Sequence, residues 1–170
     1  MGGIISSIEP NSIAEDLGWQ PGDEIVGING HDLQDAIDFR FYSADELVTI
    51  TIKRGKQTAE FEIEKDLGVP LGVTFKDILF DGVRTCGAHC IFCFVEQLPK
   101  GLRKSLYLKD DDFRLSFLHG NFVTLANVSE DDLQRIVTQR LSPLYISVHT
   151  TEPDLRERML GRPAPDILQQ

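Results

Sequence analysis

The chain has 170 residues, of which 41% are hydrophobic and 26% are charged, a composition typical of a soluble globular protein with one large or two small domains. Its 27 acidic and 17 basic residues give a net charge of −10, which opposes general binding to nucleic acid or to an anionic membrane. No apolar run reaches the roughly 20 residues of a transmembrane helix, and the N-terminus lacks the pattern of a secretory signal. We therefore expect a cytoplasmic protein without membrane or nucleic-acid partners.

Residues 1–75 predict a small domain of short strands with two short helices. Residues 48–53 alternate apolar and polar side chains, the period-two pattern of a half-buried strand. In chain order the predicted elements are a strand at 4–8, a helix that Asn11 or Ser12 caps and that ends at Gly18, a strand at 24–28, a tight turn at Asn29-Gly30, a helix at 35–42, the strand at 48–53 and a return strand through Phe61 and Ile63.

The order of short motifs at the start of the chain resembles a PDZ domain. Ile4-Ile5 leads to Pro10-Asn11-Ser12-Ile13-Ala14, and Pro21-Gly22-Asp23-Glu24-Ile25 precedes Ile28-Asn29-Gly30. PDZ domains add an extended peptide to a sheet edge and hold its terminal carboxylate on backbone N–H groups. The usual carboxylate-binding loop is missing before Ile4, and a similar run, Pro70-Leu71-Gly72-Val73-Thr74-Phe75, lies at the far end instead.

We infer from this order a circularly permuted PDZ-like domain. The resemblance implies that Leu71, Gly72 and Val73 bind the C-terminal peptide or protein ligand. The alternative is that 70–75 is only a linker strand and that the groove is vestigial or internal.

From residue 76 onward, strands alternate with helices. Ser129 and Asp132 form a capping-box-like start for a helix at 130–140. The other predicted elements are a short helix ending near Pro99, a strand at 113–118, its continuation or neighbour at 121–125, a strand at 144–148, and a helix that opens at Thr151 and Pro153 and runs toward Leu160. Such alternation argues for parallel α/β units. The expected fold class is therefore α+β, with the PDZ-like domain at 1–75 followed by an incomplete α/β segment at 76–170.

The only three cysteines, Cys86, Cys90 and Cys93, lie within eight residues. Thiolates are the ligands of iron–sulfur clusters, which usually take four, so a three-thiol site leaves one iron open. One alternative is structural zinc, which needs four ligands and could recruit His89 or His119. A disulfide would leave one cysteine over and would need an oxidising compartment.

The cysteine spacing resembles that of the radical S-adenosylmethionine (SAM) enzymes, in which three thiolates bind three irons of a [4Fe-4S] cluster and the fourth iron binds SAM. The resemblance implies Cys86, Cys90 and Cys93 as metal ligands. It also implies that Phe92 packs on the adenine of SAM, and that Gly120 and Asn121, at a glycine-containing strand end, bind its amino group.

The superfamily builds a partial or complete α/β barrel, with its site at the C-terminal ends of the strands. Ser147 and His149 follow a predicted strand and are therefore candidates for the pocket and for a catalytic role; His149 could equally be an ordinary buried histidine. Lys100, Arg103 and Lys104 are read as a solvated loop balanced by the acids at 110–112, with contact to an anionic substrate or redox partner as the alternative.

Longer stretches are similar to a family of iron–sulfur oxidoreductases that joins a PDZ domain to a radical SAM domain and a C-terminal domain of unknown function. These stretches are 92–107 with Lys109-Asp110-Asp111-Asp112, then Phe117-Leu118-His119-Gly120-Asn121-Phe122, and Ser147-Val148-His149-Thr150-Thr151-Glu152-Pro153. The barrel needs about twice the strand–helix units that 76–170 provides, so we expect a truncated member of this family.

The resemblance implies a radical SAM iron–sulfur oxidoreductase of unknown substrate, with a [4Fe-4S] cluster, SAM, and an electron donor such as ferredoxin or flavodoxin. Enzymatic activity of the shortened chain stays an open question. The alternatives are a PDZ-like peptide-binding adaptor with a structural metal site and an electron-transfer protein that works without SAM.

Overall fold

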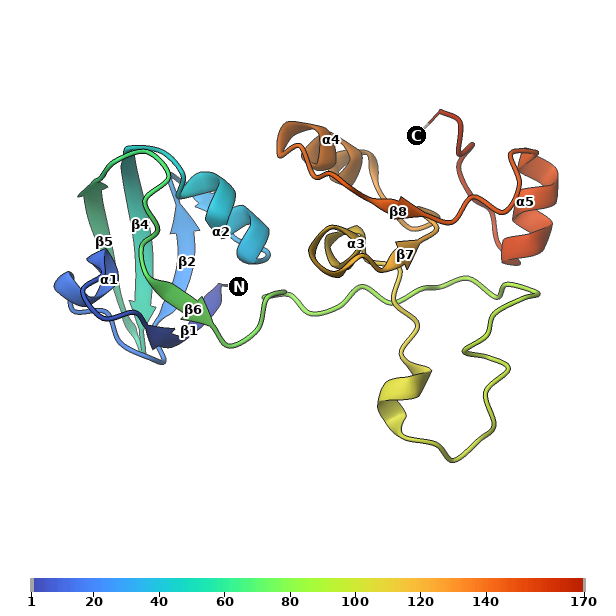
Figure 1. The fold of residues 1–170 in the computed structure, drawn as a ribbon, viewed down its shortest axis with the longest axis horizontal. Coiled ribbons are helices and arrows are strands. Elements are labelled where there is room, and N and C mark those ends of the chain that lie inside the picture. Colours follow the sequence, from blue (N-terminus) through green and yellow to red (C-terminus); the bar gives the residue numbers. More distant parts are fainter. Residues whose placement is uncertain (1, 170) are drawn as a thin grey trace. The chain divides into compact units, whose positions relative to one another are not determined.

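The structure is a computed structural model that describes residues 2–169 (Figure 1). It divides into two compact units, with the boundary between Gly82 and Val83. None of the helices in the described part of the chain is long and apolar enough to cross a membrane.

The first unit is the PDZ-like domain. Its central sheet has the strand order β5-β4-β2-β1-β6, and β3 pairs with β2. Helices and strands occur in the order β1 (Gly3–Ile8), α1 (Ile13–Asp16), β2 (Glu24–Ile28), β3 (His31–Asp32), α2 (Ala36–Tyr42), β4 (Leu47–Arg54), β5 (Gln57–Glu64) and β6 (Val73–Phe75). The alternation predicted for 48–53 is confirmed, because Val48, Ile50 and Ile52 are buried within β4.

Local sequence signals explain where the helices of this unit begin. The Ser12 hydroxyl accepts a hydrogen bond from the Glu15 N–H at 3.3 Å and caps α1. The Asp35 carboxylate accepts two bonds of 3.0 Å from the Ile37 and Asp38 N–H groups and caps α2. Both are N-cap residues whose side chains satisfy N–H groups that the first helical turn leaves free.

The segment after Pro70 joins the sheet at its edge. β6 pairs antiparallel with β1, and Val73 lies opposite Ile8. The last strand of the unit therefore completes the sheet beside the first, as a circularly permuted PDZ domain requires. Leu71, at the start of this segment, belongs to the same hydrophobic core as Ile5 and Ile25.

The second unit is an α/β segment. Its elements are the 3-10 helix η1 (Lys104–Tyr107), α3 (Phe113–His119), β7 (Phe122–Val123), α4 (Glu130–Thr138), β8 (Tyr145–Ile146) and α5 (Pro153–Leu160). β7 and β8 pair in parallel, with Phe122 opposite Tyr145, and α4 connects them. The predicted capping box is confirmed, because Ser129 and Asp132 cap α4 reciprocally.

Residues 113–118 were predicted to form a strand, and this prediction is wrong. They form α3, whose first turn is capped by the Asp112 carboxylate, which accepts a hydrogen bond from the Arg114 N–H at 3.1 Å. Gly120 ends the helix with φ = 75°, a left-handed conformation that glycine adopts without steric cost. Gly120 therefore ends a helix before β7, and the prediction that it ends a strand is wrong.

The helix predicted to end near Pro99 is also absent. Residues 91–98 form turns, and the nearest regular element is η1, which begins at Lys104. The cysteine loop therefore owes its shape to contacts with distant segments of the second unit.

Candidate metal and cofactor site

A cavity of about 650 Å³ lies among the loops of the second unit. This volume is in the range of roughly 300–1,000 Å³ that small-molecule and cofactor sites occupy. Its walls include every residue that the sequence predicted for the cluster, for SAM and for the pocket beside them. These are Cys86, Cys90, Cys93, Phe92, Gly120, Asn121, Ser147 and His149.

All three thiols are free and partly buried. Burial raises the pKa of the Cys90 thiol, and the neighbouring charges of Cys86 and Cys93 raise it further, while Lys109 lowers it. Three thiolates so close together disfavour one another unless a cation lies between them. A cluster of cationic iron supplies that charge, so the donor set fits an iron–sulfur cluster.

A site for a single metal ion needs a different arrangement of ligands from a site for an iron–sulfur cluster. Among residues 2–169, no three side chains of His, Cys, Asp or Glu converge on one point that suits a lone metal ion. In a [4Fe-4S] cluster each thiolate binds a different iron, so such convergence is not needed. The two histidines considered as a fourth zinc ligand do not line the cavity, and the side chain of His89, which is 77% exposed, contacts Glu96 instead.

Backbone hydrogen bonds hold the cysteine loop in place. The Cys86 N–H donates to the Lys109 carbonyl at 2.7 Å, and the His89 N–H donates to the Leu160 carbonyl at 2.9 Å. Gly161, just after α5, has φ = 66°, and a Cβ there would lie 2.6 Å from the His89 carbonyl oxygen. This close approach requires glycine.

Lys109 connects the middle of the loop to its exit. Its ammonium donates to the Ala88 carbonyl at 2.7 Å and to a Glu96 carboxylate oxygen at 2.6 Å. The hydrogen bond with Glu96 and its charge raise the pKa of Lys109 against the effect of burial, and the thiol charges of Cys93 and Cys86 raise it further. Lys109 also lines the cavity. Lys109 belongs to the motif at 109–112, but no role for its side chain was predicted from the sequence.

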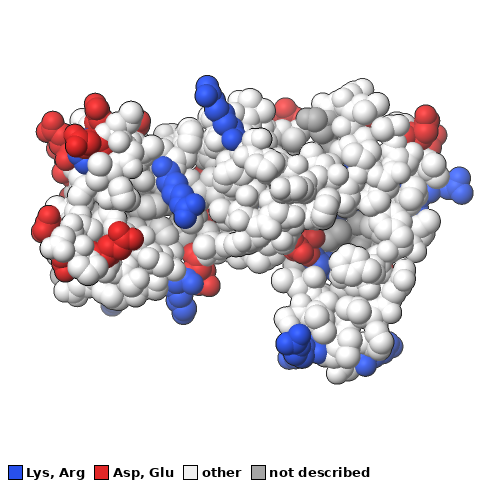
Figure 2. All heavy atoms as spheres, in the orientation of Figure 1, with Lys and Arg blue, Asp and Glu red and all other residues white. Residues whose placement is uncertain are grey.

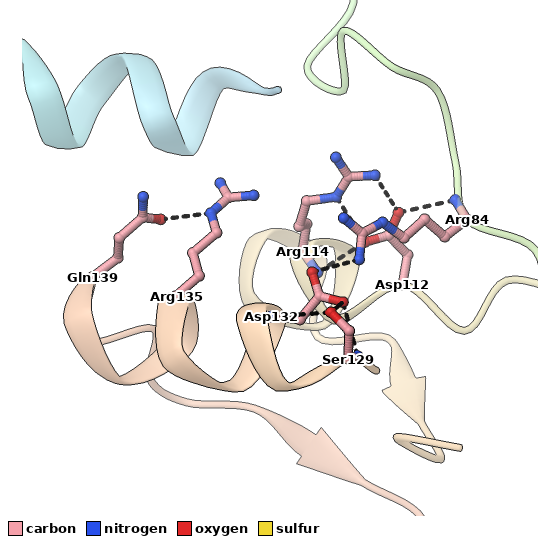
Figure 3. A network of polar contacts seen from close by, with 7 residues as sticks. All are labelled: Arg84, Asp112, Arg114, Ser129, Asp132, Arg135 and Gln139. Carbon is pink, nitrogen blue, oxygen red and sulfur yellow. Dashed lines mark hydrogen bonds and ion pairs between the residues drawn. The ribbon is translucent and has the colours of Figure 1, made fainter. Parts of the chain in front are cut away.

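A buried polar network fixes the chain just before the cysteines (Figure 3). Asp112 accepts hydrogen bonds from the Arg84 N–H at 3.0 Å and from the Arg114 guanidinium at 2.9 and 2.8 Å. The Arg84 guanidinium pairs with Asp132 at 2.7 Å, so one arginine joins the starts of α3 and α4. Burial alone would raise the pKa of Asp112, but these hydrogen bonds outweigh burial and hold it below its ordinary value.

The His149 and Phe92 rings both line the cavity and contact each other, with ring centroids 4.4 Å apart. Burial lowers the pKa of His149, and the nearby positive charge of Arg156 lowers it further. The imidazole is therefore neutral at pH 7, which suits stacking and hydrogen bonding. Ser147 follows β8 and donates its N–H to the Val123 carbonyl at 2.8 Å. Asn121 is oriented by a 2.8 Å hydrogen bond from its amide to Asp110.

The basic residues Lys100, Arg103 and Lys104 are exposed around η1, and Figure 2 shows basic side chains at the end of this segment. The expected balance by residues 110–112 is wrong. Asp110 accepts from Asn121, Asp111 accepts from Thr124 at 2.5 and 2.7 Å, and Asp112 binds Arg114. These carboxylates face inward because 84–86 runs beside 109–112, with Thr85 bridged to Asp110.

A second cavity, of about 470 Å³, lies in the PDZ-like unit between α2 and residues 68–75. It is lined by all three residues predicted to bind a peptide, Leu71, Gly72 and Val73. The carbonyls of Leu71 and Gly72 accept hydrogen bonds from Ala14 and Glu9 at 2.9 and 2.8 Å. Within the described residues, the N–H groups of Leu71 and Gly72 donate to no partner. Two free N–H groups at the end of a groove are suited to a carboxylate.

Together, the fold and the two cavities define a chain with a PDZ domain followed by a radical SAM-like domain. The protein belongs to the radical SAM-like domain family, whose family model matches residues 65–170, and a PDZ domain model matches residues 4–54.

Two solved structures are similar to part of the chain. They are the PDZ domains of the SdrC-like proteins from Listeria monocytogenes and Listeria innocua, with 25% and 21% sequence identity. Each comparison covers 45% of this chain, together with 88% and 96% of the respective Listeria chains, at TM-scores of 0.37 and 0.38. None of the curated proteins matches the chain.

Proposed function

We propose that the second unit is a radical SAM-type iron–sulfur centre of an oxidoreductase whose substrate is unknown. The observation that carries this proposal is that three thiols and Phe92, all from one short loop, line the same cavity as Gly120, Asn121 and His149, which come from distant segments of the chain. When bound, a [4Fe-4S] cluster supplies the electron that cleaves the sulfonium bond of SAM at the iron without a protein ligand.

The residues of the chain have distinct roles in this proposal. Cys86, Cys90 and Cys93 bind the cluster. Phe92 packs on the adenine, and the adjacent imidazole of His149 extends the same wall. The segment formed by Gly120 and Asn121 binds the amino group of SAM. Ser147 lines the pocket beside these groups.

Anaerobic reconstitution with iron and sulfide tests the proposal. We expect the reduced protein to give the electron paramagnetic resonance signal of a [4Fe-4S] cluster, and we expect SAM to shift it. A cluster whose signal SAM leaves unchanged would favour a simple electron-transfer protein. Stoichiometric zinc in place of iron would favour an adaptor with a structural metal site.

The first unit is the peptide-binding part of the protein. The free N–H groups of Leu71 and Gly72 favour this function, because they lie at one end of the groove beside the edge strand β6. The ligand is the C-terminus of a peptide or partner protein, with Val73 lining the groove next to these donors. Binding of a labelled peptide with a free C-terminus, compared with its amidated form, tests this function.

We assign residues 1–75 to the PDZ-like domain and 76–170 to the radical SAM-like segment. We place the protein in the cytoplasm, where thiols stay reduced. An acidic one-electron donor such as ferredoxin or flavodoxin is the expected redox partner, because Lys100, Arg103 and Lys104 are exposed near the cysteine loop in sequence.

A further inference from the structure

We propose that the substrate of the radical SAM-type centre is a neutral, apolar small molecule. It binds against four side chains that line the cavity of the three cysteines, which we call the apolar wall: Phe94, Leu106, Leu108 and Phe122. This inference rests on the proposed function of the second unit and goes further by naming the chemical class of the substrate.

The apolar wall is a part of the cavity that the proposed cluster and SAM sites do not use. Those sites account for the three cysteines and for Phe92, Gly120 and Asn121, and Ser147 and His149 lie beside them. The four residues of the apolar wall are lining residues without such a role, and all four have large hydrophobic side chains that are exposed to solvent. The cavity therefore offers apolar surface to a further molecule.

Three separate segments supply the apolar wall. Phe94 follows the last cysteine, and it is 77% exposed. Leu106 and Leu108 lie in and just after η1, and Phe122, which is 70% exposed, begins β7. Exposed apolar side chains are common singly, but several that gather in one concave site mark a ligand-binding surface. Ile91 shows the difference, because it is 73% exposed on the same loop as Phe94 but does not line the cavity.

The part of the apolar wall at Phe122 is held in place without a ligand. The Phe122 ring packs edge-on against Tyr145, with ring centroids 5.9 Å apart. The residue before it, Asn121, donates its side-chain amide to Asp110 at 2.8 Å. A surface that is already ordered loses little conformational entropy when a ligand binds, which favours binding to it.

The charges in the cavity favour a neutral ligand. Apart from the thiols, the charged residues that line it in the described part of the chain are Lys109, Asp110 and Asp111. Each already has a partner in the chain. Lys109 pairs with Glu96 at 2.6 Å, and the two aspartates accept hydrogen bonds from neighbouring side chains at 2.8 and 2.7 Å. A charged group of a ligand would therefore lose water without gaining a partner.

An apolar ligand gains from the same arrangement. It removes its own surface and the exposed surface of the apolar wall from water, and this burial is favourable in proportion to the apolar area. The two phenylalanine rings, Phe94 and Phe122, also offer faces and edges to a planar ring of the ligand. The concave shape of the site suits a small molecule more than the flat surface of a partner protein.

Equilibrium dialysis of the full chain, after anaerobic reconstitution with iron and sulfide, tests the proposal. Two probes share an apolar body: N-phenylnaphthylamine is neutral, and anilinonaphthalene sulfonate adds a negative charge. We expect the neutral probe to bind at least about tenfold more tightly than the anionic one. Phe94→Gln and Phe122→Gln should each weaken binding of the neutral probe about fivefold. Both side chains are exposed, so these variants should keep the fold.

Ile91→Gln is the matched control, because Ile91 is equally exposed on the cysteine loop and does not line the cavity. This variant keeps the wild-type affinity. Binding of the anionic probe as tightly as the neutral one overturns the neutral class of substrate. Binding that both Phe variants leave unchanged places the probe elsewhere and overturns the role of the apolar wall. Displacement of the probe by S-adenosylhomocysteine assigns the apolar wall to SAM and also overturns the proposal.

The cluster is scored separately, by its electron paramagnetic resonance signal. A signal that SAM shifts, together with no binding of the neutral probe, overturns the apolar substrate and leaves the radical SAM-type centre intact. Probe binding that depends on Phe94 and Phe122 in a chain without a cluster overturns the proposed centre, and the substrate role of the apolar wall with it.

Discussion

The Lys109 ammonium and the Ala88 carbonyl oxygen lie 2.7 Å apart. Ala88 stands between Cys86 and Cys90, so this hydrogen bond fixes the middle of the loop that carries the three thiols. The second bond of Lys109, to Glu96, fixes the chain three residues after Cys93. A single side chain thus sets the separation between the two parts of the cysteine loop.

Replacing Lys109 with Met removes both bonds but keeps most of the side-chain volume. A hydrogen bond to a charged group contributes about 1.5–3 kcal/mol, so we expect the reconstituted variant to lose iron to a ferrous chelator at least about tenfold faster. The release of iron is followed by absorbance. Lys104→Met, in the exposed η1 segment, is the control and should release iron at the wild-type rate. Equal rates in all three proteins would contradict a positioning role for Lys109.

Single Cys→Ala changes at positions 86, 90 and 93 each remove one of the three proposed cluster ligands. We expect each variant to lose the [4Fe-4S] signal after reconstitution, and we expect the triple variant to bind no stoichiometric iron, measured by metal analysis. His89→Ala should retain iron, because the His89 side chain is directed to Glu96. A loss of metal in His89→Ala equal to that in the cysteine variants would instead favour a four-ligand zinc site.

Replacing Asp112 with Asn removes the carboxylate charge that pairs with the buried Arg114 guanidinium at 2.8 Å. Breaking a buried pair costs about 3–5 kcal/mol, so the second unit should unfold at a much lower urea concentration. Trp19, the only tryptophan, lies in the first unit, so its fluorescence reports that unit and should show an unchanged midpoint. Circular dichroism, which reports on both units, should show that the second unit of the variant unfolds at a lower urea concentration than that of the wild type. Asp131→Asn, at an exposed position of α4, serves as the control.

Asp23 and Arg54 form an ion pair of 2.6 Å in the first unit. The hydrogen bond from Arg54 lowers the pKa of Asp23 below its ordinary value of 3.8, against the opposing effect of burial. The unfolded chain therefore takes up this proton at a higher pH than the folded one. The stabilisation is complete well above pH 3.8 and is lost as the pH falls from there through the lower folded pKa.

Urea titrations followed by Trp19 fluorescence between pH 7 and pH 2 measure this dependence. Asp23→Asn should be less stable than wild type at pH 7, and the difference should shrink as the pH falls. A difference that stays constant down to pH 2 would show that the ion pair is not the source of the effect.

Local sequence patterns predicted those parts of the fold that depend on neighbouring residues. The alternation at 48–53 and the capping pair Ser129 and Asp132 both sit in the predicted elements. The strand predicted at 113–118 failed because Phe113, Leu115 and Phe117 alternate as in a strand, while Phe113 and Phe117 also share one helix face. Asp112 caps the N-terminus of this segment and Gly120 its C-terminus, and these two caps favour the helix over the strand.

The cluster of cysteines in the candidate site can be recognised in the sequence, but the residues that hold the cysteine loop in place cannot. The close spacing of the cysteines is a local signal, whereas the burial of Asp111 and Asp112 depends on pairing with 84–86, some 25 residues earlier in the chain. For the same reason, nothing near Lys109 in the sequence indicates its bond to Ala88.

Val95 and Ser105 both line the cysteine cavity, but none of the residues 96–104 between them does. Residues 96–104 therefore form an excursion of the chain away from the cavity. At the tip of this excursion, Gly101 has open space around the position of a Cβ, and the Tyr107 hydroxyl closes the excursion by donating to the Pro99 carbonyl and accepting from the Leu102 N–H. Exposed loop tips of this kind accept added chain. An affinity tag inserted between Lys100 and Gly101 should therefore leave the cavity intact during anaerobic purification, and a cleavable tag keeps Lys100, Arg103 and Lys104 available to an electron donor afterwards.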